Sequence, residues 1–403
     1  MARRIFTIIT LLLLLSSCAS PDQDMSNEYI GKSDYPYMYH STGNGTQIAY
    51  SDKGYYFLNG DYIYFMDKQN NSPVILDNRP DNGCVDNSED RTNCNAYVSH
   101  ASPSDYLFIQ YYEDHLYTME SRVETGKAAV YELVRRNPDG SNRKVMKTFS
   151  NGVVKSVNIH RGFLYYSVQD YDKDSNMSYQ LLRLPLERLS KKPEILYVGE
   201  YKQGSISDVL AYGAQIYFIE FTDTGYRTMR YDLKTTSTEP LWLSNDGGYA
   251  ALSSIHDKHL YFKYYYPTIA SDNSDLFDKR TLVIYRSQLD GSDIRATNIK
   301  SSPIISNVYI DSQYTYVRPV WFQLTKVKDV ANEMKIYKDG NLVQTLDMSP
   351  FSLTHNLFVG DENNMFVIEF TGDKSVLYYL NKSAIESANA KFIRMLETSV
   401  RTQ

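Results

Sequence analysis

The side chains that most often perform catalysis are present in this sequence, but their spacing matches no catalytic pattern. The closest pair among the seven histidines, His256 and His259, lies three residues apart at the start of a predicted strand. Side chains three apart in a strand leave on opposite faces, so the pair does not predict a metal site. The sequence also lacks a Gly-x-Ser-x-Gly elbow and a Gly-rich phosphate-binding loop. These absences argue against the common hydrolase and nucleotide-binding classes, although a triad assembled from distant loops would leave no such motif.

One acidic cluster resembles the start of a calcium-binding loop. Asp170, Asp172 and Asp174 alternate along the chain, and alternating carboxylates can direct oxygen atoms at one hard cation. The sixth position of such a loop requires glycine and the twelfth an acidic residue, but this chain has Ser175 and Leu181 there. We therefore interpret the cluster as a solvated hairpin tip, and we predict neither a metal ion nor another cofactor.

Two cysteines, Cys84 and Cys94, lie close together in the sequence. In an oxidising compartment we expect them to form a disulfide, with two free thiols as the alternative. A metal site is a weaker possibility, because two cysteines without a nearby histidine supply only half of a zinc site.

Aromatic residues offer candidate stacking platforms for a sugar or a peptide. The 37 tyrosines are spread evenly along the chain, and in alternating strands most of them would pack between sheets. Trp321 differs because it follows Arg318-Pro319 within an irregular insertion. It is therefore the candidate ligand-binding residue.

The N-terminus is typical of an exported, lipid-modified protein. After two arginines, an apolar stretch of eleven residues runs from Ile5 to Leu15, whereas about 20 residues would be needed to span a bilayer. Leu15-Ser16-Ser17-Cys18 resembles the bacterial lipobox, in which the cysteine thiol is diacylglycerylated. We expect a signal peptide over 1–17 and a lipid on Cys18 that anchors the chain to the cell membrane or outer envelope of a bacterium. The alternative is an ordinary secretory signal with an incidental cysteine.

Charge argues against one class of partner. Removal of the signal peptide would take away Arg3 and Arg4 and move the formal net charge from −6 to −8. A mildly acidic chain without a basic tract is a poor binder of nucleic acid. We therefore expect the membrane and a protein or glycan as partners, and no nucleic acid.

A repeated unit indicates the architecture. In each unit a short polar turn is followed by an apolar and then an aromatic residue, and the separations between successive units are 44 to 55 residues. That is the length of one four-stranded propeller blade. The anchoring residues are Tyr64, Tyr117, Tyr165, Tyr217, Tyr261, Tyr316 and Phe366.

The segments downstream of the anchors support this interpretation. Asp-Gly turns occur at 138–141, 289–292 and 338–341, and Asp-Gly between apolar runs is a strong hairpin signal. Two units carry a helix-compatible segment at the same place, at 186–192 and 382–388.

We therefore predict an all-β chain in which residues 46–403 form a single β-propeller domain of seven four-stranded blades, with six or eight blades as alternatives. A lone blade exposes both apolar faces of its sheet, so neighbours must stack and the ring must close. We expect a strand near 46–51 to pair with one near 392–396. The polar segment 18–45 is expected to be a flexible tether.

The first repeat adds a family resemblance. The segments are Gly54-Tyr-Tyr-Phe-Leu-Asn-Gly60, Tyr62-Ile-Tyr-Phe-Met-Asp67, Arg79-Pro-Asp81 and Cys94-Asn-Ala-Tyr97. With the lipobox, they make the chain similar to bacterial lipoproteins with a domain of unknown function of the TolB-like and low-density-lipoprotein-receptor-like propeller group. Arg79 replaces the lysine of that group, Cys84 is displaced, and an earlier cysteine is missing. The resemblance implies a fold and a location, and it implies no activity.

Three functions are compatible with these observations. The first is a non-catalytic binding or scaffolding lipoprotein that holds a protein or glycan partner on one rim of the propeller. The second is an extracytoplasmic hydrolase or lyase with a site at the central channel. The third is an accessory subunit in envelope assembly. Converging carboxylates and histidines at the channel would favour the enzyme, and an aromatic patch on one rim would favour the binding protein.

Overall fold

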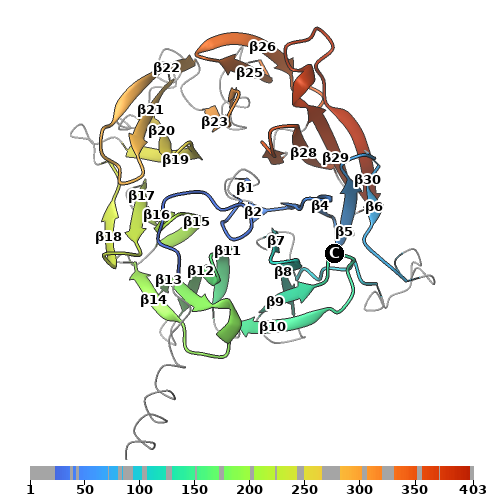
Figure 1. The fold of residues 1–403 in the computed structure, drawn as a ribbon, viewed down its shortest axis with the longest axis vertical. Coiled ribbons are helices and arrows are strands. Elements are labelled where there is room, and N and C mark those ends of the chain that lie inside the picture. Colours follow the sequence, from blue (N-terminus) through green and yellow to red (C-terminus); the bar gives the residue numbers. More distant parts are fainter. Residues whose placement is uncertain are drawn as a thin grey trace, which may run out of the picture.

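Seven small antiparallel sheets stand around a central axis and form a closed ring (Figure 1). This architecture comes from a computed structural model, and it confirms the predicted seven-bladed β-propeller. The structure describes residues 23–36, 40–41, 45–70, 72–79, 84, 94–101, 107–123, 129–149, 152–171, 177–199, 204–222, 225–242, 249–265, 282–301, 306–319, 331–351, 356–371 and 373–399.

Each blade consists of four strands that are consecutive in the sequence. The first three blades are β3 (Ile48–Tyr50), β4 (Gly54–Asn59), β5 (Tyr62–Asp67) and β6 (Val74–Ile75); β7 (Leu107–Tyr112), β8 (His115–Arg122), β9 (Val130–Arg136) and β10 (Lys144–Phe149); β11 (Val153–His160), β12 (Phe163–Tyr171), β13 (Met177–Pro185) and β14 (Glu194–Val198).

The other four blades repeat this order. They are β15 (Ser205–Tyr212), β16 (Gln215–Thr222), β17 (Gly225–Asp232) and β18 (Ser237–Pro240); β19 (Tyr249–His256), β20 (His259–Tyr265), β21 (Leu282–Gln288) and β22 (Arg295–Ser301); β23 (Ser306–Ile310), β24 (Thr315–Pro319), β25 (Glu333–Lys338) and β26 (Asn341–Asp347); β27 (Asn356–Phe358), β28 (Asn364–Thr371), β29 (Lys374–Asn381) and β30 (Ile393–Ser399).

The tight turns lie where the sequence predicts them. The three Asp-Gly turns join the third and fourth strands of the second, fifth and sixth blades, and their glycines have φ between 79° and 84°. Glycine adopts such values without steric strain. The two helix-compatible segments contain the 3₁₀-helices η4 (Leu186–Arg188) and η5 (Lys382–Ala384) at the equivalent place. The expectation of hairpins and short helical insertions is confirmed.

The first repeat anchor lies on a different strand from the other six. Six anchors lie in the second strand of their blade, whereas Tyr64 lies in β5, the third strand of the first blade. The equivalent second strand is β4, which follows the turn at Asp52-Lys53. The two strands are hard to tell apart in the sequence because β4 and β5 both follow a polar turn and both combine aromatic with aliphatic residues.

The predicted exchange of strands between the first and last blades is also wrong. Residues 48–50 pair with β4 of their own blade, and the fourth strand of the last blade is β30 from that same blade. The ring closes through side chains instead. Tyr55 Oη donates to Asp361 Oδ2 over 2.5 Å, Asn59 Nδ2 donates to Thr398 Oγ1 over 3.1 Å, and the ring of Phe366 packs against Tyr55.

Polar side chains also join the innermost strands of neighbouring blades. Gln110 on β7 exchanges two hydrogen bonds with the backbone of Ile159 on β11. Asn158 on β11 then donates to Val209 O on β15 over 2.7 Å. Because backbone groups on the inner edge of a blade lack a strand partner, these side chains satisfy part of that edge.

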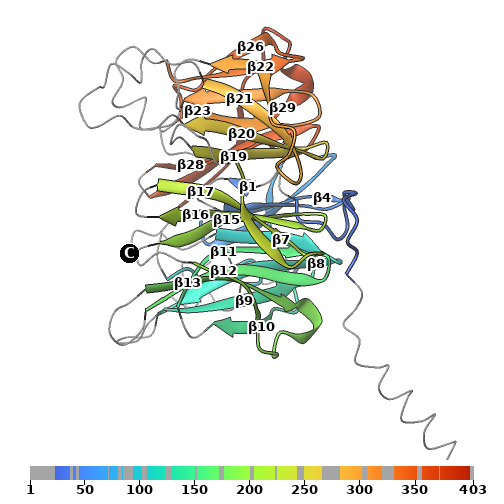
Figure 2. The same ribbon diagram turned by 90° about the vertical axis from the view of Figure 1, so that its left-hand side faces the viewer.

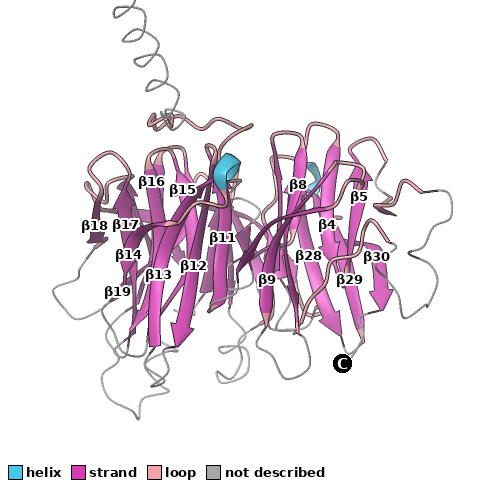
Figure 3. Ribbon diagram, turned by 90° about the horizontal axis from the view of Figure 1, so that it is seen from below, coloured by secondary structure: helices cyan, strands magenta, loops and turns pink. Residues whose placement is uncertain are grey.

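The two faces of the disc are different. Each first strand turns into the second at what we call the turn face, for example at Arg161-Gly162 and Asp257-Lys258. The second strands end at the opposite face. Figure 2 and Figure 3 show the N-terminal segment lying along the turn face, while the last described strand, β30, ends at the opposite face. No helix among the described residues has the length and apolar character needed to cross a membrane.

We predict that Asn59→Ala weakens the closure of the ring. Asn59 is buried and bonds both Ser375 and Thr398 of the last blade, so its removal leaves the buried Ser375 hydroxyl without its acceptor. The free energy of unfolding in urea should fall by about 1–3 kcal/mol. Asn341→Ala, at an exposed position that begins β26, should change it by less than about 0.5 kcal/mol. Equal effects of the two substitutions would contradict side-chain closure.

Candidate functional site

The N-terminal segment is a structural part of the propeller. Residues 23–36 lie along the turn face and pack against the third blade, with Asp34 and Tyr35 almost fully buried. The expectation of a flexible tether therefore does not hold for residues 23–36. The composition of this segment is that of a linker, but a distant side chain fixes it in place.

That side chain is Arg161, in the turn between β11 and β12. Its Nε and one Nη2 proton donate to the two carboxylate oxygens of Asp34, over 2.6 and 2.9 Å. The remaining protons donate to the carbonyl oxygens of Asp24, Ser26 and Glu28, over 2.6 to 2.8 Å. All five N–H donors of the guanidinium group are thus used, in a side chain that is 2% exposed.

The neighbouring His160 continues the same contact. Its Nδ1 accepts the backbone N–H of Tyr35 over 3.0 Å, and its Nε2 donates to Gly213 O over 2.8 Å. This arrangement requires the neutral ring, because a proton on Nδ1 would face the N–H of Tyr35. Burial lowers the pKa of His160 from 6.5 to about 4, against the opposing effect of Asp34.

From Tyr35 the chain enters the centre of the ring. Tyr35 Oη lies 2.9 Å from Thr46 Oγ1. The short strands β1 (His40–Ser41) and β2 (Gly45–Thr46) form a hairpin near the axis (Figure 1), and β2 pairs in parallel with β7. Gln47 is buried and accepts from Asn356 Nδ2 of the last blade over 2.6 Å. The middle of the propeller is therefore occupied by its own N-terminal segment.

The occupied centre bears on the enzyme hypothesis. Four buried polar side chains near the centre already have partners: Thr46 bonds to the Tyr35 hydroxyl, Gln110 to the backbone of Ile159, and Gln47 to Asn356. In that part of the chain, one group of three potential metal ligands occurs, and it lies away from the axis: Asp77, Cys84 and Cys94. No convergence of histidines and carboxylates is found at the channel among these residues.

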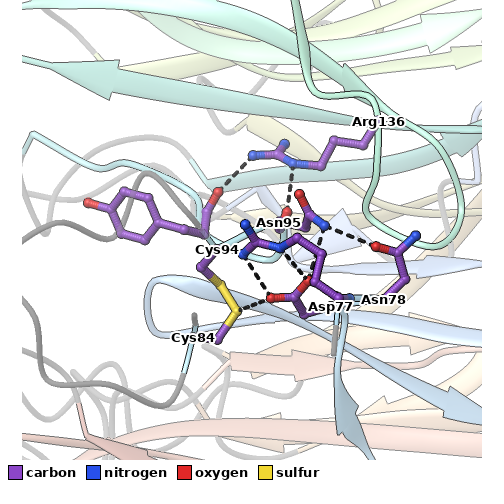
Figure 4. Close-up of a disulfide and its surroundings, with 8 residues drawn as sticks. Asp77, Asn78, Cys84, Cys94, Asn95 and Arg136 are labelled. Carbon is purple, nitrogen blue, oxygen red and sulfur yellow. Dashed lines mark hydrogen bonds and ion pairs between the residues drawn. A yellow bond between two sulfur atoms is a disulfide. The ribbon is translucent and has the colours of Figure 1, made fainter. Parts of the chain in front are cut away.

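The two cysteines form a disulfide in the structure, with Sγ atoms 1.95 Å apart (Figure 4). Asp77 Oδ2 lies 3.0 Å from Cys84 Sγ, and the Asp77 carboxylate also accepts from Arg79 and Asn95. The bonded sulfurs leave Asp77 as the one remaining ligand, so the arrangement suits a structural cross-link and not a metal site.

A buried arginine ties this region to the second blade. Arg136 on β9 pairs with Glu120 over 2.6 Å and donates to the backbone oxygens of Asn95 and Tyr97 (Figure 4). The connection between the first and second blades is therefore held at Cys94–Tyr97 by the cross-link and by Arg136.

Two of the sequence-predicted site residues, Cys18 and Trp321, lie outside the described residues. The structure instead shows aromatic side chains that the sequence analysis did not single out. Trp242 follows β18 with φ of +50°, a value that is unusual for a bulky residue. Its ring stacks on Tyr264 at 5.1 Å and meets Tyr285 edge-on at 4.5 Å.

Exposed aromatic residues also end several second strands on the opposite face. Tyr171, Phe221 and Phe370 are 57%, 41% and 38% exposed at the ends of β12, β16 and β28. Phe221 and Phe370 occupy equivalent positions, four residues after Tyr217 and Phe366, whereas Tyr171 lies six residues after Tyr165. The sequence carried a signal for two of them, because Ile-Glu-Phe-Thr occurs at both 219–222 and 368–371.

No protein-family model matches this chain, and no curated protein matches it. A chain from an analysis of two prolyl endopeptidases is similar in structure, with a TM-score of 0.58 and 9% identity over 91% of this chain and 51% of that one. An oligogalacturonate lyase in complex with manganese gives a TM-score of 0.53 and 12% identity, over 87% and 89%. This chain thus spans about half the length of the endopeptidase chain. At these identities the likeness shows the propeller fold alone, which is shared by hydrolase and lyase propellers.

We predict that His160 makes stability depend on pH below neutrality. The pKa of about 4 in the folded chain lies below the ordinary 6.5, so the unfolded chain binds the proton more tightly. The contribution of neutral His160 to the free energy of unfolding is fully present above about pH 6.5. It is lost as the pH falls towards 4, and the loss is at most about 3 kcal/mol.

The measurement is urea unfolding at several pH values, with His160→Gln as the matched variant. Glutamine can accept from Tyr35 and donate to Gly213 but does not titrate, so this variant should lose much of the dependence between pH 6.5 and 4. If the free energy of unfolding of His160→Gln fell with pH as steeply as that of the wild type, other groups would cause the pH dependence.

Proposed function

We propose that this protein is a membrane-anchored extracytoplasmic lipoprotein that binds or scaffolds a protein or glycan partner and has no catalytic activity of its own. The observation that carries the proposal is the occupied centre of the propeller. The enzyme alternative requires a reaction site at the central channel, where the described residues instead place the β1–β2 hairpin and its buried polar contacts.

The N-terminal contacts support a definite orientation at the membrane. Gln23 Nε2 donates to Tyr165 Oη over 3.0 Å, and Asp24, Ser26 and Glu28 are bound to Arg161. A lipid on Cys18 would be five residues from Gln23, a reach of about 17 Å at the most for an extended chain. The turn face is then close to the membrane, and the opposite face is turned away from it.

A surface turned away from the membrane is the one that a partner can reach. That surface carries Tyr171, Phe221 and Phe370 at three second-strand ends. Aromatic side chains are enriched where proteins contact other proteins, and their rings also stack on sugars. The three residues are therefore the proposed contact points, and they take the role that the sequence analysis gave to Trp321.

The proposal predicts capture of a partner from crosslinked cells by the lipidated wild-type protein, with the mature Cys18→Ser chain as the soluble control. A triple variant, Tyr171→Ser with Phe221→Ser and Phe370→Ser, should reduce capture at least tenfold because it removes the proposed aromatic contacts. The matched control replaces three exposed apolar residues of the outermost strands, Ile195, Val198 and Leu342, by serine and should capture normally.

Two results would overturn the proposal. One is cleavage of glycan or peptide substrates by the purified chain, which would favour the enzyme. The other is equal capture by the two triple variants, which would place the contact elsewhere.

A further inference from the structure

A pocket of about 480 Å³ lies between the fifth and sixth blades at the turn face. Strands β20 to β22 form one wall, and the turns at 310–315 and 337–340 form the other. The volume falls within the roughly 300–1,000 Å³ of small-molecule sites. The pocket is separate from the central channel and from the aromatic residues of the opposite face, so it goes beyond the proposed function.

Two arginines lie side by side in its wall. Arg286 on β21 and Arg295 on β22 are register partners across the two strands. Arg295 pairs with Asp293 over 2.7 Å. Arg286 interacts with the Tyr261 hydroxyl, and in the described part of the chain it pairs with no carboxylate. Its guanidinium group is therefore available to a negatively charged ligand.

The buried acid of the pocket does not cancel this charge. Asp311 accepts from Lys382 Nζ over 2.6 Å and from Tyr316 Oη over 2.7 Å. Its other oxygen accepts the backbone N–H groups of Gln313 and Tyr314. Asp311 is thus compensated by the buried Lys382, and its bonds hold the turn that forms one wall.

The remaining polar groups suit hydroxyl groups. Asn298 and Asp339 line the pocket from β22 and from the turn after β25. His256 is half-buried at its edge, and burial lowers the pKa of His256, which favours the neutral ring. Tyr261 and Tyr337 pack against the apolar cluster between these blades, so their rings are held in place as flat walls.

We propose that this pocket binds a small acidic sugar. Arg286 and Arg295 bind the carboxylate, because the guanidinium fork matches the two carboxylate oxygens. Asn298 donates to and accepts from the ring hydroxyls, whereas the Asp339 carboxylate accepts from them, and a tyrosine ring covers an apolar face of the sugar.

The test is isothermal titration of the mature Cys18→Ser chain with D-glucuronate, D-glucose and inorganic phosphate at pH 7. Glucuronate should bind, and glucose should bind at least tenfold more weakly because it lacks the carboxylate. Arg286→Ala should weaken the binding of glucuronate at least tenfold. Arg394→Ala, an exposed arginine on β30 that pairs with Glu397, should bind as the wild type does. Unfolding midpoints of both variants should equal that of the wild type, because both side chains are exposed.

Three outcomes would overturn the inference: no binding of glucuronate by the wild type, equal binding by Arg286→Ala, or phosphate binding as tightly as glucuronate, which would indicate a general anion site. Failure here is distinguishable from failure of the proposed function. Arg286→Ala should leave partner capture through the opposite face unchanged whatever the titration shows.

Discussion

The arrangement of this protein depends on one buried guanidinium group. Arg161 uses all of its N–H donors on the N-terminal segment, and Asp34 supplies the opposite charge inside the same contact. Removing either partner from such a pair leaves an uncompensated buried charge, which is strongly unfavourable. The pair therefore fixes residues 24–34 on the turn face, next to the turn between β11 and β12.

Buried polar contacts of the same kind join blade to blade. Lys382 and Asp311 connect the last two blades, and Glu220 accepts from Tyr179 and Tyr197 across the boundary between the third and fourth. Apolar packing between blades is abundant but tolerant of small shifts. Hydrogen-bonded charged groups do not tolerate such shifts, because a small displacement breaks their hydrogen bonds. These contacts therefore specify how each blade is placed against the next.

The sequence is sufficient to predict the fold because its signals are local. Each blade is built from consecutive residues, and turns such as 289–292 are determined by an Asp-Gly pair. The predicted blade count is right even though Tyr64 lies on the third strand of its blade and the other anchors on the second, because β4 and β5 carry similar patterns. Closure of the ring could not be predicted, since it depends on Asn59 meeting residues more than 300 positions away.

The candidate site was harder to predict than the fold, because it too depends on residues that are far apart in the sequence. Residues 23–36 have the composition of a linker, and nothing in them indicates that Arg161 binds them. The pocket between the fifth and sixth blades combines residues of seven strands and two turns, none of which carries a motif by itself. In contrast, Phe221 and Phe370 lie in a repeated tetrapeptide, so the sequence alone was enough to single them out.

The central claim is that the N-terminal segment is folded as part of the propeller, and backbone hydrogen exchange of the mature soluble chain tests it most directly. The amide of Tyr35, which is bonded to His160, should exchange as slowly as the amide of Ile159 in β11, to within about tenfold. Exchange of Tyr35 at the rate of an unstructured peptide would show that the segment is a free tether, and the orientation built on it would be wrong.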